Sequence, residues 1–335
     1  MSVTVLGIDG GGTKTHAAIM DSAGRLLGSG LGGPSNYNNV GVDVVRASIA
    51  AAVRAAHDAA GIVGAPLDAA FLGMAGVVSP ADRAAIHAIA ADLRLAAPER
   101  VGVDHDCRIA LAGGLSGRPG IVQIAGTGSS CFGMNASGES WRSGGWGHVM
   151  ADEGSSYWFG VEALRAAVRA YDGRGPQTEL LDRVRERLRL AEMNDIMRRV
   201  YVEGMAPAEI AALAPDVIAA ARRLDPVACQ LVQQGAREIA DCVVAVAQRL
   251  GMEGGPCELA LVGGLFQADD AVIPPLRERL AESLPGCRVQ MADLPPVLGA
   301  CLLALQSLGL ALPALERLHA LRGPARIGEE RRDDG

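Results

Sequence analysis

The chain has little lysine, few aromatic residues and no regular spacing of cysteines. Lys14 is the only lysine, so arginine carries nearly all of the positive charge. The 31 basic residues stand against 38 acidic ones, which gives a formal net charge of −7, and no basic run covers a whole face of the chain. A protein whose main partner is nucleic acid needs a basic patch. The composition therefore argues against nucleic acid as the main partner.

The seven cysteines form no CxxC pair, and most of them lie inside apolar runs. This pattern predicts reduced, buried thiols rather than a disulfide framework or a zinc site. The N-terminus lacks the basic start and apolar core of a signal peptide. The most apolar stretch, residues 297–312, contains Gln306 and Ser307, so it predicts a buried helix rather than a membrane span. We therefore expect a cytoplasmic protein with no membrane contact.

The length and composition indicate a globular protein of two domains, with 335 residues of which 49% are hydrophobic and 21% charged. Short apolar runs separated by glycine-containing turns predict a three-strand meander, followed by alternating helices and strands. The expected elements of the first half are strands at 3–8, 15–20 and 25–29, a helix at 42–60, a strand at 69–74, a helix at 80–93, a strand at 100–104 and a helix from Cys107.

A similar order begins again near Gly120. The expected elements are strands at 121–124, 130–135 and 139–142, a helical insertion at 151–250, a strand at 258–262, a helix at 270–282, a strand at 288–291 and a helix at 297–307. This repetition predicts an α/β fold with mixed sheets covered by helices. We expect an N-terminal domain at 1–117, a C-terminal domain at 118–310, and a helix and tail at 311–335 whose domain is left open.

The first predicted strand runs into a glycine-rich turn, Gly10-Gly11-Gly12, followed by Thr13. Glycines let backbone amides approach an anion closely, and Thr13 adds a hydroxyl donor. Asp9, at the strand end, can hold Mg²⁺ through water, because Mg²⁺ prefers oxygen ligands. The common nucleotide-binding motifs are absent here, so two interpretations stay open: a phosphate-binding turn, or a tight hairpin that only needs glycine.

A second glycine-rich turn, Gly126-Thr127-Gly128, follows a strand at the equivalent place in the second half. Two such turns in two like domains are expected to face each other across a cleft and to hold the phosphates of a nucleotide from both sides. The pair is more specific than either turn alone, so the sequence predicts nucleotide binding.

A strand ends and a helix begins at residues 103–107, between the two turns. Asp106 can be an ordinary N-cap of that helix. It can also be a carboxylate at the cleft that takes a proton from a substrate hydroxyl during phosphoryl transfer. His105 is expected to be a surface residue or a neighbour of the site.

Residues 143–158 contain four glycines and two tryptophans ahead of a long predicted helix. The glycines can bring the backbone close to a ligand, and Trp146 offers an apolar wall. Asp152 and Glu153 offer acceptors for hydroxyl groups. This set is typical of a sugar site, and a buried tryptophan with a helix-capping acid is the alternative. Two weaker candidates are the polar loop around Asn36 and the Gly263-Gly264 pair after a late strand.

Together these residues resemble the N-acetylglucosamine kinase branch of the BadF/BadG-type ATPases, within the superfamily of actin-like ATPases and hexokinases. The motifs fall in the family's order over roughly residues 5–305, and the Gly-Gly-Trp-Gly block is the most specific. The carrying motifs are Gly-Ile-Asp-Gly-Gly-Gly-Thr-Lys-Thr at 7–15, Pro-Ser-Asn at 34–36, Asp106, Ile-Ala-Gly-Thr-Gly-Ser at 124–129, Gly-Gly-Trp-Gly-His at 144–148, Asp-Glu-Gly-Ser at 152–155, Gly-Gly at 263–264 and Pro-Val-Leu-Gly-Ala at 296–300.

The resemblance implies two RNase H-like domains, ATP and Mg²⁺ in the cleft, phosphoryl transfer to the 6-hydroxyl of an amino sugar, and a homodimer. By position it implies Asp106 as the base and Asp9 as the carboxylate on the metal side. The remaining contacts that it implies are Gly11, Gly12, Thr13 and Thr127 for phosphate, Gly264 for the nucleoside, and Asn36, Gly145, Trp146 and Asp152 for the sugar. The residue patterns add Gly126 and Gly128 for phosphate, Gly263 for the nucleoside and Asp106 for the sugar.

N-acetylglucosamine is the expected substrate, and glucosamine is the alternative within the same family. An ATPase that activates a radical dehydratase would need two cysteines in one glycine-rich loop near the base, to hold an iron–sulfur cluster, and the sequence has none there. A regulator that only senses sugar usually carries an added DNA-binding segment, which is not expected ahead of the first strand. We therefore expect a kinase that retains catalysis.

Overall fold

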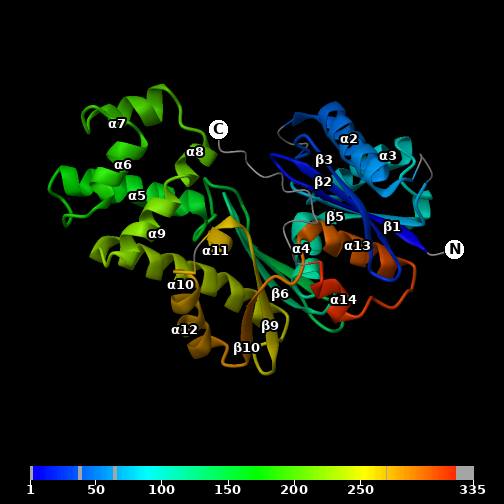
Figure 1. The fold of residues 1–335 in the computed structure, drawn as a ribbon. Coiled ribbons are helices and arrows are strands. Elements are labelled where there is room, and N and C mark those ends of the chain that lie inside the picture. Colours follow the sequence, from blue (N-terminus) through cyan, green and yellow to red (C-terminus); the bar gives the residue numbers. More distant parts are fainter. Residues whose placement is uncertain (1–2, 37–39, 63–65, 269, 322–335) are drawn as a thin grey trace. The chain divides into compact units, whose positions relative to one another are not determined.

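The structure is a computed structural model that describes residues 3–36, 40–62, 66–268 and 270–321. The contacts within the chain divide it into two compact units. Figure 1 colours the chain along the sequence, from blue at the N-terminus to red at the C-terminus. The first unit consists of residues 1–119 and 292–335, and the second consists of residues 120–291. The second unit is therefore one continuous segment that interrupts the first.

The first unit is built on a five-stranded sheet. Its strands are β1 (Thr4–Gly10), β2 (Thr15–Asp21), β3 (Leu26–Gly32), β4 (Ala69–Met74) and β5 (Val101–His105). They lie in the order β3-β2-β1-β4-β5, with an antiparallel meander of β1, β2 and β3 and a parallel extension by β4 and β5. The carboxyl ends of the parallel strands β1, β4 and β5 therefore lie at one edge of the sheet.

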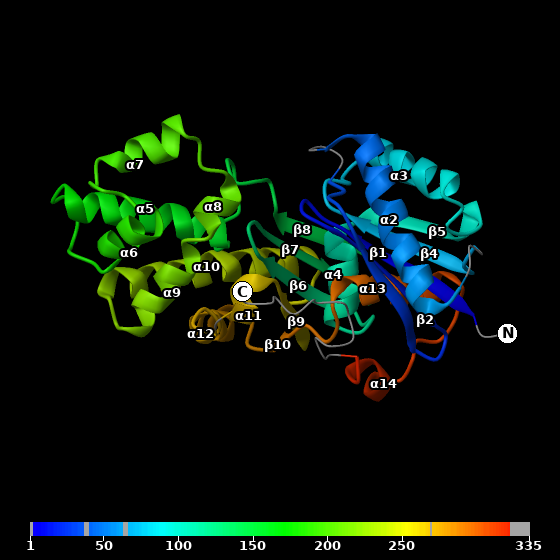
Figure 2. The same ribbon diagram turned by 45° about the horizontal axis from the view of Figure 1, so that its top comes forward.

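Helices cover both faces of this sheet (Figure 2). They are α2 (Val42–Ala60), α3 (Pro80–Asp92), the 3₁₀ turn η1 (Pro98–Arg100), α4 (Asp106–Gly114), α13 (Pro296–Ser307) and α14 (Leu315–His319). Successive residues of a strand point to opposite faces, so Leu6 and Ile8 of β1 pack with α2 and α3, while Val5 packs against α13.

Two helices of the first unit, α4 and α13, approach each other closely because glycine stands at their contact. A Cβ atom on Gly299 of α13 would lie 2.1 Å from the carbonyl oxygen of Ile109 in α4. A Cβ atom on Gly113 of α4 would lie 2.9 Å from the carbonyl oxygen of Leu294, whose N–H donates to Gly113 at 3.0 Å. Protein interiors leave no room for an extra methyl group at such distances. The glycines therefore set how closely α4 lies against α13.

The second unit repeats the same sheet order. Its strands are β6 (Gly120–Ala125), β7 (Ser129–Met134), β8 (Ser140–Gly144), β9 (Cys257–Val262) and β10 (Cys287–Met291). They lie in the order β10-β9-β6-β7-β8, again a three-strand antiparallel meander extended by two parallel strands. The prediction of an α/β protein with two RNase H-like domains is confirmed.

The helical insertion of the second unit lies between β8 and β9, as the sequence predicts. Its elements are α5 (Ser156–Tyr171), α6 (Leu180–Arg187), α7 (Asp195–Met197), the π-helical turn η2 (Arg198–Val202), α8 (Pro207–Ala211), α9 (Ala214–Arg222) and α10 (Pro226–Arg249). The short α11 (Gly264–Ala268) and α12 (Ile273–Ser283) lie between β9 and β10. The Asp225 carboxylate caps α10 by accepting two backbone N–H groups.

The position of α13 corrects the domain boundaries expected from the sequence. The sequence analysis places residues 297–307 in the C-terminal domain at 118–310, whereas α13 packs on β1, β4 and α4 of the first unit. An apolar helix pattern shows that a helix is buried but not which sheet buries it. Of residues 311–335, which the sequence leaves open, residues 311–321 group with the first unit, and residues 322–335 lie outside the described part of the chain. Within the described residues, no helix combines the length and the apolar character that a membrane span requires.

The contact between α4 and α13 makes a prediction about stability. Gly299→Ala is expected to lower the free energy of unfolding by about 1–3 kcal/mol, because the added methyl group must displace the backbone of α4. Urea unfolding followed by circular dichroism measures the change. Gly254→Ala is the control, since a Cβ atom there meets nothing within 4 Å and is expected to change stability by less than about 0.5 kcal/mol. Equal stability of the two variants would contradict the packing argument.

Candidate functional site

The turn between β1 and β2 is a hairpin tied to the segment after β3. The Gly11 N–H donates to the Lys14 carbonyl oxygen at 3.0 Å, and the N–H groups of Ser35 and Asn36 donate to the Gly11 carbonyl oxygen at 2.9 and 3.2 Å. Gly12 is exposed, its φ is not positive, and a side chain there would meet nothing within 4 Å. Neither backbone conformation nor packing within the described chain requires glycine at this position. Close approach of a ligand is the remaining physical reason for it.

Asp9 is the last residue but one of β1, just before this turn, and its environment disfavours the ionised form. Burial, followed by the charge of Asp106, raises the pKa of the Asp9 carboxyl to about 7, and the charge of Lys14 opposes the shift. The two carboxylates therefore lie close enough within the first unit to affect each other. A cation between or beside them would relieve both the burial and the repulsion.

The junction of β5 and α4 positions Asp106. The Asp104 carboxylate pairs with the Arg83 guanidinium at 2.8 Å and accepts the His105 N–H at 2.9 Å, so Asp104 has structural partners. Asp106 is the first residue of α4, while the N-cap is His105, which forms no side-chain cap bond. The contact found for the Asp106 carboxylate among the described residues is the Cys107 thiol at 3.5 Å. The N-cap interpretation of Asp106 is therefore wrong.

Asn36 lies after β3, next to the first glycine-rich turn. Its backbone N–H is fixed by the bond to Gly11, while its side-chain oxygen Oδ1 is buried and has no hydrogen-bond partner in the part of the chain that the structure describes. Buried acceptors are normally satisfied. An unpaired acceptor beside the turn is what a hydroxyl group of a ligand would complete.

The turn between β6 and β7 is the second candidate for phosphate contact. The Gly126 N–H donates to the Gly128 carbonyl oxygen at 2.9 Å. The start of α5 is tied to this turn, because the Ser156 N–H donates to Gly126 at 2.9 Å and the Tyr157 N–H donates to Thr127 at 3.2 Å. Thr127 itself is exposed, and a side chain at Gly126 would meet nothing within 4 Å. Like Gly12 in the first turn, Gly126 has free space where a side chain would stand, so the second turn also leaves room for a ligand.

Asp152 lies against the second turn. Its carboxylate Oδ1 accepts the Ser129 N–H at 3.2 Å, and a Cβ atom on Gly128 would lie 3.0 Å from its other oxygen. Its backbone is left-handed, with φ of 67°, which is uncommon for a residue other than glycine. Burial raises the pKa of this carboxyl, and the hydrogen bond from Ser129 opposes the shift. The chain thus holds a buried acceptor in a strained backbone beside the turn.

Trp146 follows two glycines at the end of β8 and is not part of the core. Gly144 and Gly145 have φ of 70° and 69°, and a Cβ atom on Gly145 would lie 2.7 Å from the Ser130 hydroxyl. The tryptophan side chain is 63% exposed, so the alternative of a buried tryptophan is wrong. The ring is therefore available as an apolar surface for a ligand.

The Gly263-Gly264 pair lies at the same sheet edge as the second turn. β9 runs parallel to β6, with Val262 paired to Ile124, so both strands end side by side. Gly263 has φ of 113°, and a Cβ atom on it would lie 2.2 Å from the Ala125 carbonyl oxygen, so local packing already requires this glycine. Gly264 has no such requirement, because nothing lies within 4 Å of its Cβ position.

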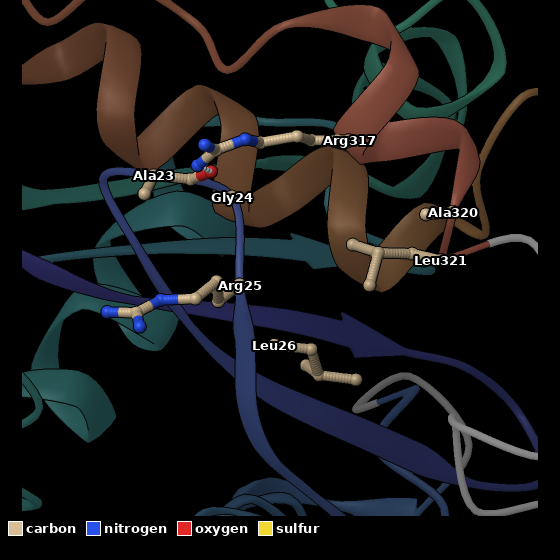
Figure 3. Close-up of a pocket in the computed structure, with 7 residues that line it drawn as sticks. All are labelled: Ala23, Gly24, Arg25, Leu26, Arg317, Ala320 and Leu321. Atoms are coloured by element: carbon tan, nitrogen blue, oxygen red, sulfur yellow. Dashed lines mark hydrogen bonds between the residues drawn. The ribbon is translucent and has the colours of Figure 1, made fainter.

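A cavity of about 660 Å³ in the first unit lies away from these residues. It is lined by the turn between β2 and β3 and by α14 with the residues after it (Figure 3). That turn is at the opposite end of β2 from Gly12. Its two arginines have structural roles, since Arg25 pairs with Asp21 at 2.6 Å and Arg317 donates to the Ala23 carbonyl oxygen at 3.4 Å. The cavity is therefore not part of the candidate site.

The sequence analysis missed three contributors to the site. Gln123 donates to the Ser129 hydroxyl at 2.9 Å and so supports the second turn. Tyr157 stacks edge-on against His148, with ring centres 5.1 Å apart. The Arg142 guanidinium lies 5.2 Å from the centre of the Trp146 ring. The spacing of four residues between Arg142 and Trp146 is visible in the sequence, but only the structure shows that they stack.

Comparison with known proteins adds an independent line of evidence. The sequence pattern of the BadF/BadG/BcrA/BcrD ATPase family matches residues 6–304. The chain is 33% identical to an N-acetylmuramic acid/N-acetylglucosamine kinase of Clostridium acetobutylicum, over 90% of this chain and 97% of that protein. It is 30% identical to an N-acetyl-D-glucosamine kinase of Dictyostelium discoideum, over 90% and 98% of the two chains. A crystal structure of a presumed N-acetylglucosamine kinase from Chromobacterium violaceum is similar with a TM-score of 0.72 at 29% identity, covering 91% of this chain and 99% of that one.

The raised pKa of Asp9 predicts that this residue costs stability at neutral pH. A carboxyl whose pKa is about 7 in the folded state and 3.8 in the unfolded chain stabilises the fold fully below pH 3.8, and this stability is lost as the pH rises through 7. Without nucleotide or divalent cation, Asp9→Asn is therefore expected to be more stable than the unaltered protein at pH 8, by about 1–4 kcal/mol. Thermal unfolding measures this gain, which should shrink toward pH 5. A variant less stable than the unaltered protein at pH 8 would contradict the assignment.

Proposed function

Because the chain belongs to the BadF/BadG/BcrA/BcrD ATPase family, we propose that it transfers a phosphoryl group from ATP to the 6-hydroxyl of N-acetylglucosamine. Its relatives over nine-tenths of the chain are sugar kinases, so it is an ATP-dependent sugar kinase. The identity of the substrate as N-acetylglucosamine and the roles of single residues are proposals.

The proposal rests mainly on the position of Asp106 in α4 and on the effect of its charge on Asp9. Its carboxylate stands at the first residue of α4 without a capping role, and the charge of Asp106 reaches Asp9. Within the described residues, this carboxylate accepts no backbone N–H at the start of α4, so its favourable position at the positive end of the helix leaves its oxygens available to a ligand. It is suited to accept the proton of a substrate hydroxyl as that oxygen attacks the phosphoryl group. Because the transition state of phosphoryl transfer is loose, most of the remaining catalysis is positioning and charge stabilisation.

The two open turns are the proposed phosphate contacts. Gly11, Gly12 and Thr13 would present backbone N–H groups and a hydroxyl in the first unit, and residues 126–128 would do so in the second. The absence of any side chain near the Cβ positions of Gly12 and Gly126 supports this role. Gly263 and Gly264, at the end of the strand beside β6, are the proposed contacts of the nucleoside.

Asp9 fits the role of a carboxylate on the metal side. Its pKa of about 7 reflects burial and the nearby charge of Asp106, and a divalent cation offsets both effects. Mg²⁺ prefers carboxylate and water oxygens, so Asp9 would hold the ion directly or through water. When bound, Mg²⁺ neutralises the charge of the phosphate oxygens.

Asn36, Asp106, Gly145, Trp146 and Asp152 are the proposed sugar contacts. Asn36 supplies the unpaired buried oxygen, and Asp152 supplies a carboxylate in a strained backbone. Trp146 supplies an exposed apolar ring for the N-acetyl group. Polar acceptors with one apolar wall match a polyhydroxylated ring with an acyl substituent.

Glucosamine is the second candidate substrate, since the chain is also 26% identical to a glucosamine kinase of Vibrio cholerae over 82% of its length. The exposed Trp146 favours the N-acetyl sugar. Release of ADP with N-acetylglucosamine, glucosamine and glucose distinguishes them. A kcat/KM highest for N-acetylglucosamine supports the proposal, and a kcat/KM highest for glucosamine would replace it. The homodimer that the resemblance implies, and the cytoplasmic location expected from the sequence, are part of this proposal.

Asp106→Asn tests the proposed base. The variant keeps the size of the side chain but removes the proton acceptor, so turnover is expected to fall by roughly 10²–10⁴ with near-native binding of ATP and sugar. Steady-state kinetics and equilibrium binding measure the two effects. Asp104→Asn is the control, because Asp104 already pairs with Arg83 and the His105 N–H, and it is expected to lose far less activity. Unchanged turnover in Asp106→Asn would show that the base lies elsewhere.

Trp146→Ala tests the contact with the N-acetyl group. Loss of one apolar contact is worth roughly 1–3 kcal/mol in kcat/KM, so activity on N-acetylglucosamine should fall more than activity on glucose. Trp141→Ala is the matched control, because Trp141 is also exposed but stacks against Arg249. Equal losses for both sugars in Trp146→Ala would argue against the contact.

A further inference from the structure

The strands β9 and β10, which lie side by side in the sheet of the second unit (Figure 1), both begin with a cysteine. Cys257 is the first residue of β9, Cys287 is the first residue of β10, and the parallel register pairs the two directly. Residues paired in this way point to the same face of a sheet. On that face lies a hydrophobic core of the second unit, in which Cys257 is buried and against which Cys287 packs.

The two sulfur atoms are in contact, because the Cys287 thiol donates a hydrogen bond to the Cys257 sulfur. Neighbouring strands lie about 4.7–4.9 Å apart. A disulfide needs two Cα atoms that are about 4.4–6.8 Å apart. All seven cysteines of the chain are free thiols. The fold therefore places two free thiols at the separation that a disulfide requires.

The backbone next to the two cysteines holds them at this separation. The Cys257 N–H donates to the Gly286 carbonyl oxygen at 3.2 Å, and the Cys287 N–H donates to the Leu284 carbonyl oxygen at 2.9 Å. A Cβ atom on Gly286 would lie 2.6 Å from the Gly255 carbonyl oxygen, so glycine is needed for the two segments to approach this closely. The fold itself brings the thiols together before any bond joins them.

The pair lies at the rim of its sheet, because β10 is an edge strand, and Cys287 is only half-buried there. A small oxidant can reach a thiol pair in this position. Within the described residues, the strand register pairs no other two cysteines. The half-buried Cys229 of α10 offers a comparison, since its thiol contacts the Ala221 carbonyl oxygen at 3.5 Å instead of a second sulfur.

We propose that Cys257 and Cys287 are a site of reversible oxidation, at which a peroxide converts the two thiols into a disulfide. The Cys257 thiolate attacks one oxygen of hydrogen peroxide and becomes a sulfenic acid, and the other oxygen leaves as water after it takes up a proton. The Cys287 thiol then attacks the sulfenic sulfur, which forms the S–S bond and releases a second water. The pair loses two electrons and two protons, and hydrogen peroxide takes up both. A small dithiol reverses the reaction by exchange.

The contact between the thiols assists both steps. The hydrogen bond from Cys287 lowers the pKa of the Cys257 thiol, and burial opposes this effect. Because the thiolate is the reactive form of cysteine, the contact supplies the nucleophile of the first step. The same hydrogen bond, followed by burial, raises the pKa of Cys287. Cys287 therefore keeps the proton that leaves with the sulfenic hydroxyl group as water in the second step.

The disulfide would close the segment from residue 257 to residue 287, which contains α11 and α12. Closing a segment removes conformational freedom from the unfolded chain, so oxidation is expected to stabilise the second unit. Gly263 follows the far end of β9, so the disulfide would leave the proposed nucleoside contacts in place. The inference does not depend on the proposed function.

Thiol counts and peptide mapping of the full chain test the inference. Hydrogen peroxide is expected to lower the number of thiols titrated in the unfolded chain from seven to five, and dithiothreitol should restore all seven. After alkylation of the remaining thiols, trypsin should release fragment 250–277 joined to fragment 280–288, because each of these fragments contains one cysteine of the pair.

Urea unfolding followed by circular dichroism tests the effect on stability. Oxidation is expected to raise the urea midpoint of the second unit by about 1 M, and dithiothreitol should reverse the rise. Cys287→Ser should lose both the joined fragments and the rise. Cys229→Ser is the matched control, because it removes another half-buried thiol, and it should keep both.

The inference would be overturned if peroxide left Cys257 and Cys287 free, or oxidised Cys287 to a sulfinic acid without joining the fragments. Equal amounts of fragments joined through other cysteines would also overturn it. A joined product with a lower urea midpoint would show that the disulfide does not fit the native strands. The main readout uses the unaltered protein, so it does not require that a variant folds. Neither readout involves a sugar or ATP, so both remain decisive if the proposed function fails.

Discussion

The contact between α4 and α13 determines where the chemistry of the first unit is placed. α4 carries Asp106 at its first residue, and its position against α13 depends on Gly113 and Gly299, which leave no room for a methyl group. The same helix α13 packs on β1, the strand that carries Asp9 near its end and leads into the first glycine-rich turn. One tight helix contact therefore fixes the carboxylate of α4 relative to the carboxylate of β1. A shift of α4 would separate the two groups whose charges act on each other.

The candidate site keeps several groups in states that oppose stability. Asp9 is a carboxyl whose ionisation is disfavoured by burial, Asn36 has an unpaired buried oxygen, and Asp152 has a left-handed backbone. A cation would offset the buried charge of Asp9, and a hydroxyl group would complete the oxygen of Asn36. The left-handed backbone of Asp152 is held by the surrounding structure. Asp9 and Asn36 lie near the glycine-rich turn of the first unit, and Asp152 lies near that of the second, so each unit has its own evidence for a ligand contact.

Much of this arrangement could be predicted from the sequence, because local patterns determine it. Alternation of apolar residues and glycine turns predicted both meanders. The roles that the resemblance implies for Asp9, Asp106 and Trp146 stay predictions. The sheet that buries α13 could not be predicted, since periodicity shows only that a helix has an apolar face. Nor could the capping state of Asp106, which depends on a one-residue difference in where α4 begins. The unpaired oxygen of Asn36 and the stack of Arg142 are tertiary properties with no local signal.

The return of α13 to the first sheet has a consequence for how the chain acquires its fold during synthesis. Residues 120–291 form a continuous unit, so all of its strands are present before Ala292 is made. The first unit has its five strands earlier, but the face of its sheet that α13 covers must wait until residue 307 has been added. Until then the apolar residues of that face, Val5, Ala69 and Met20 among them, lack their partner helix. The N-terminal half of this protein, although translated first, is therefore the last to complete its core.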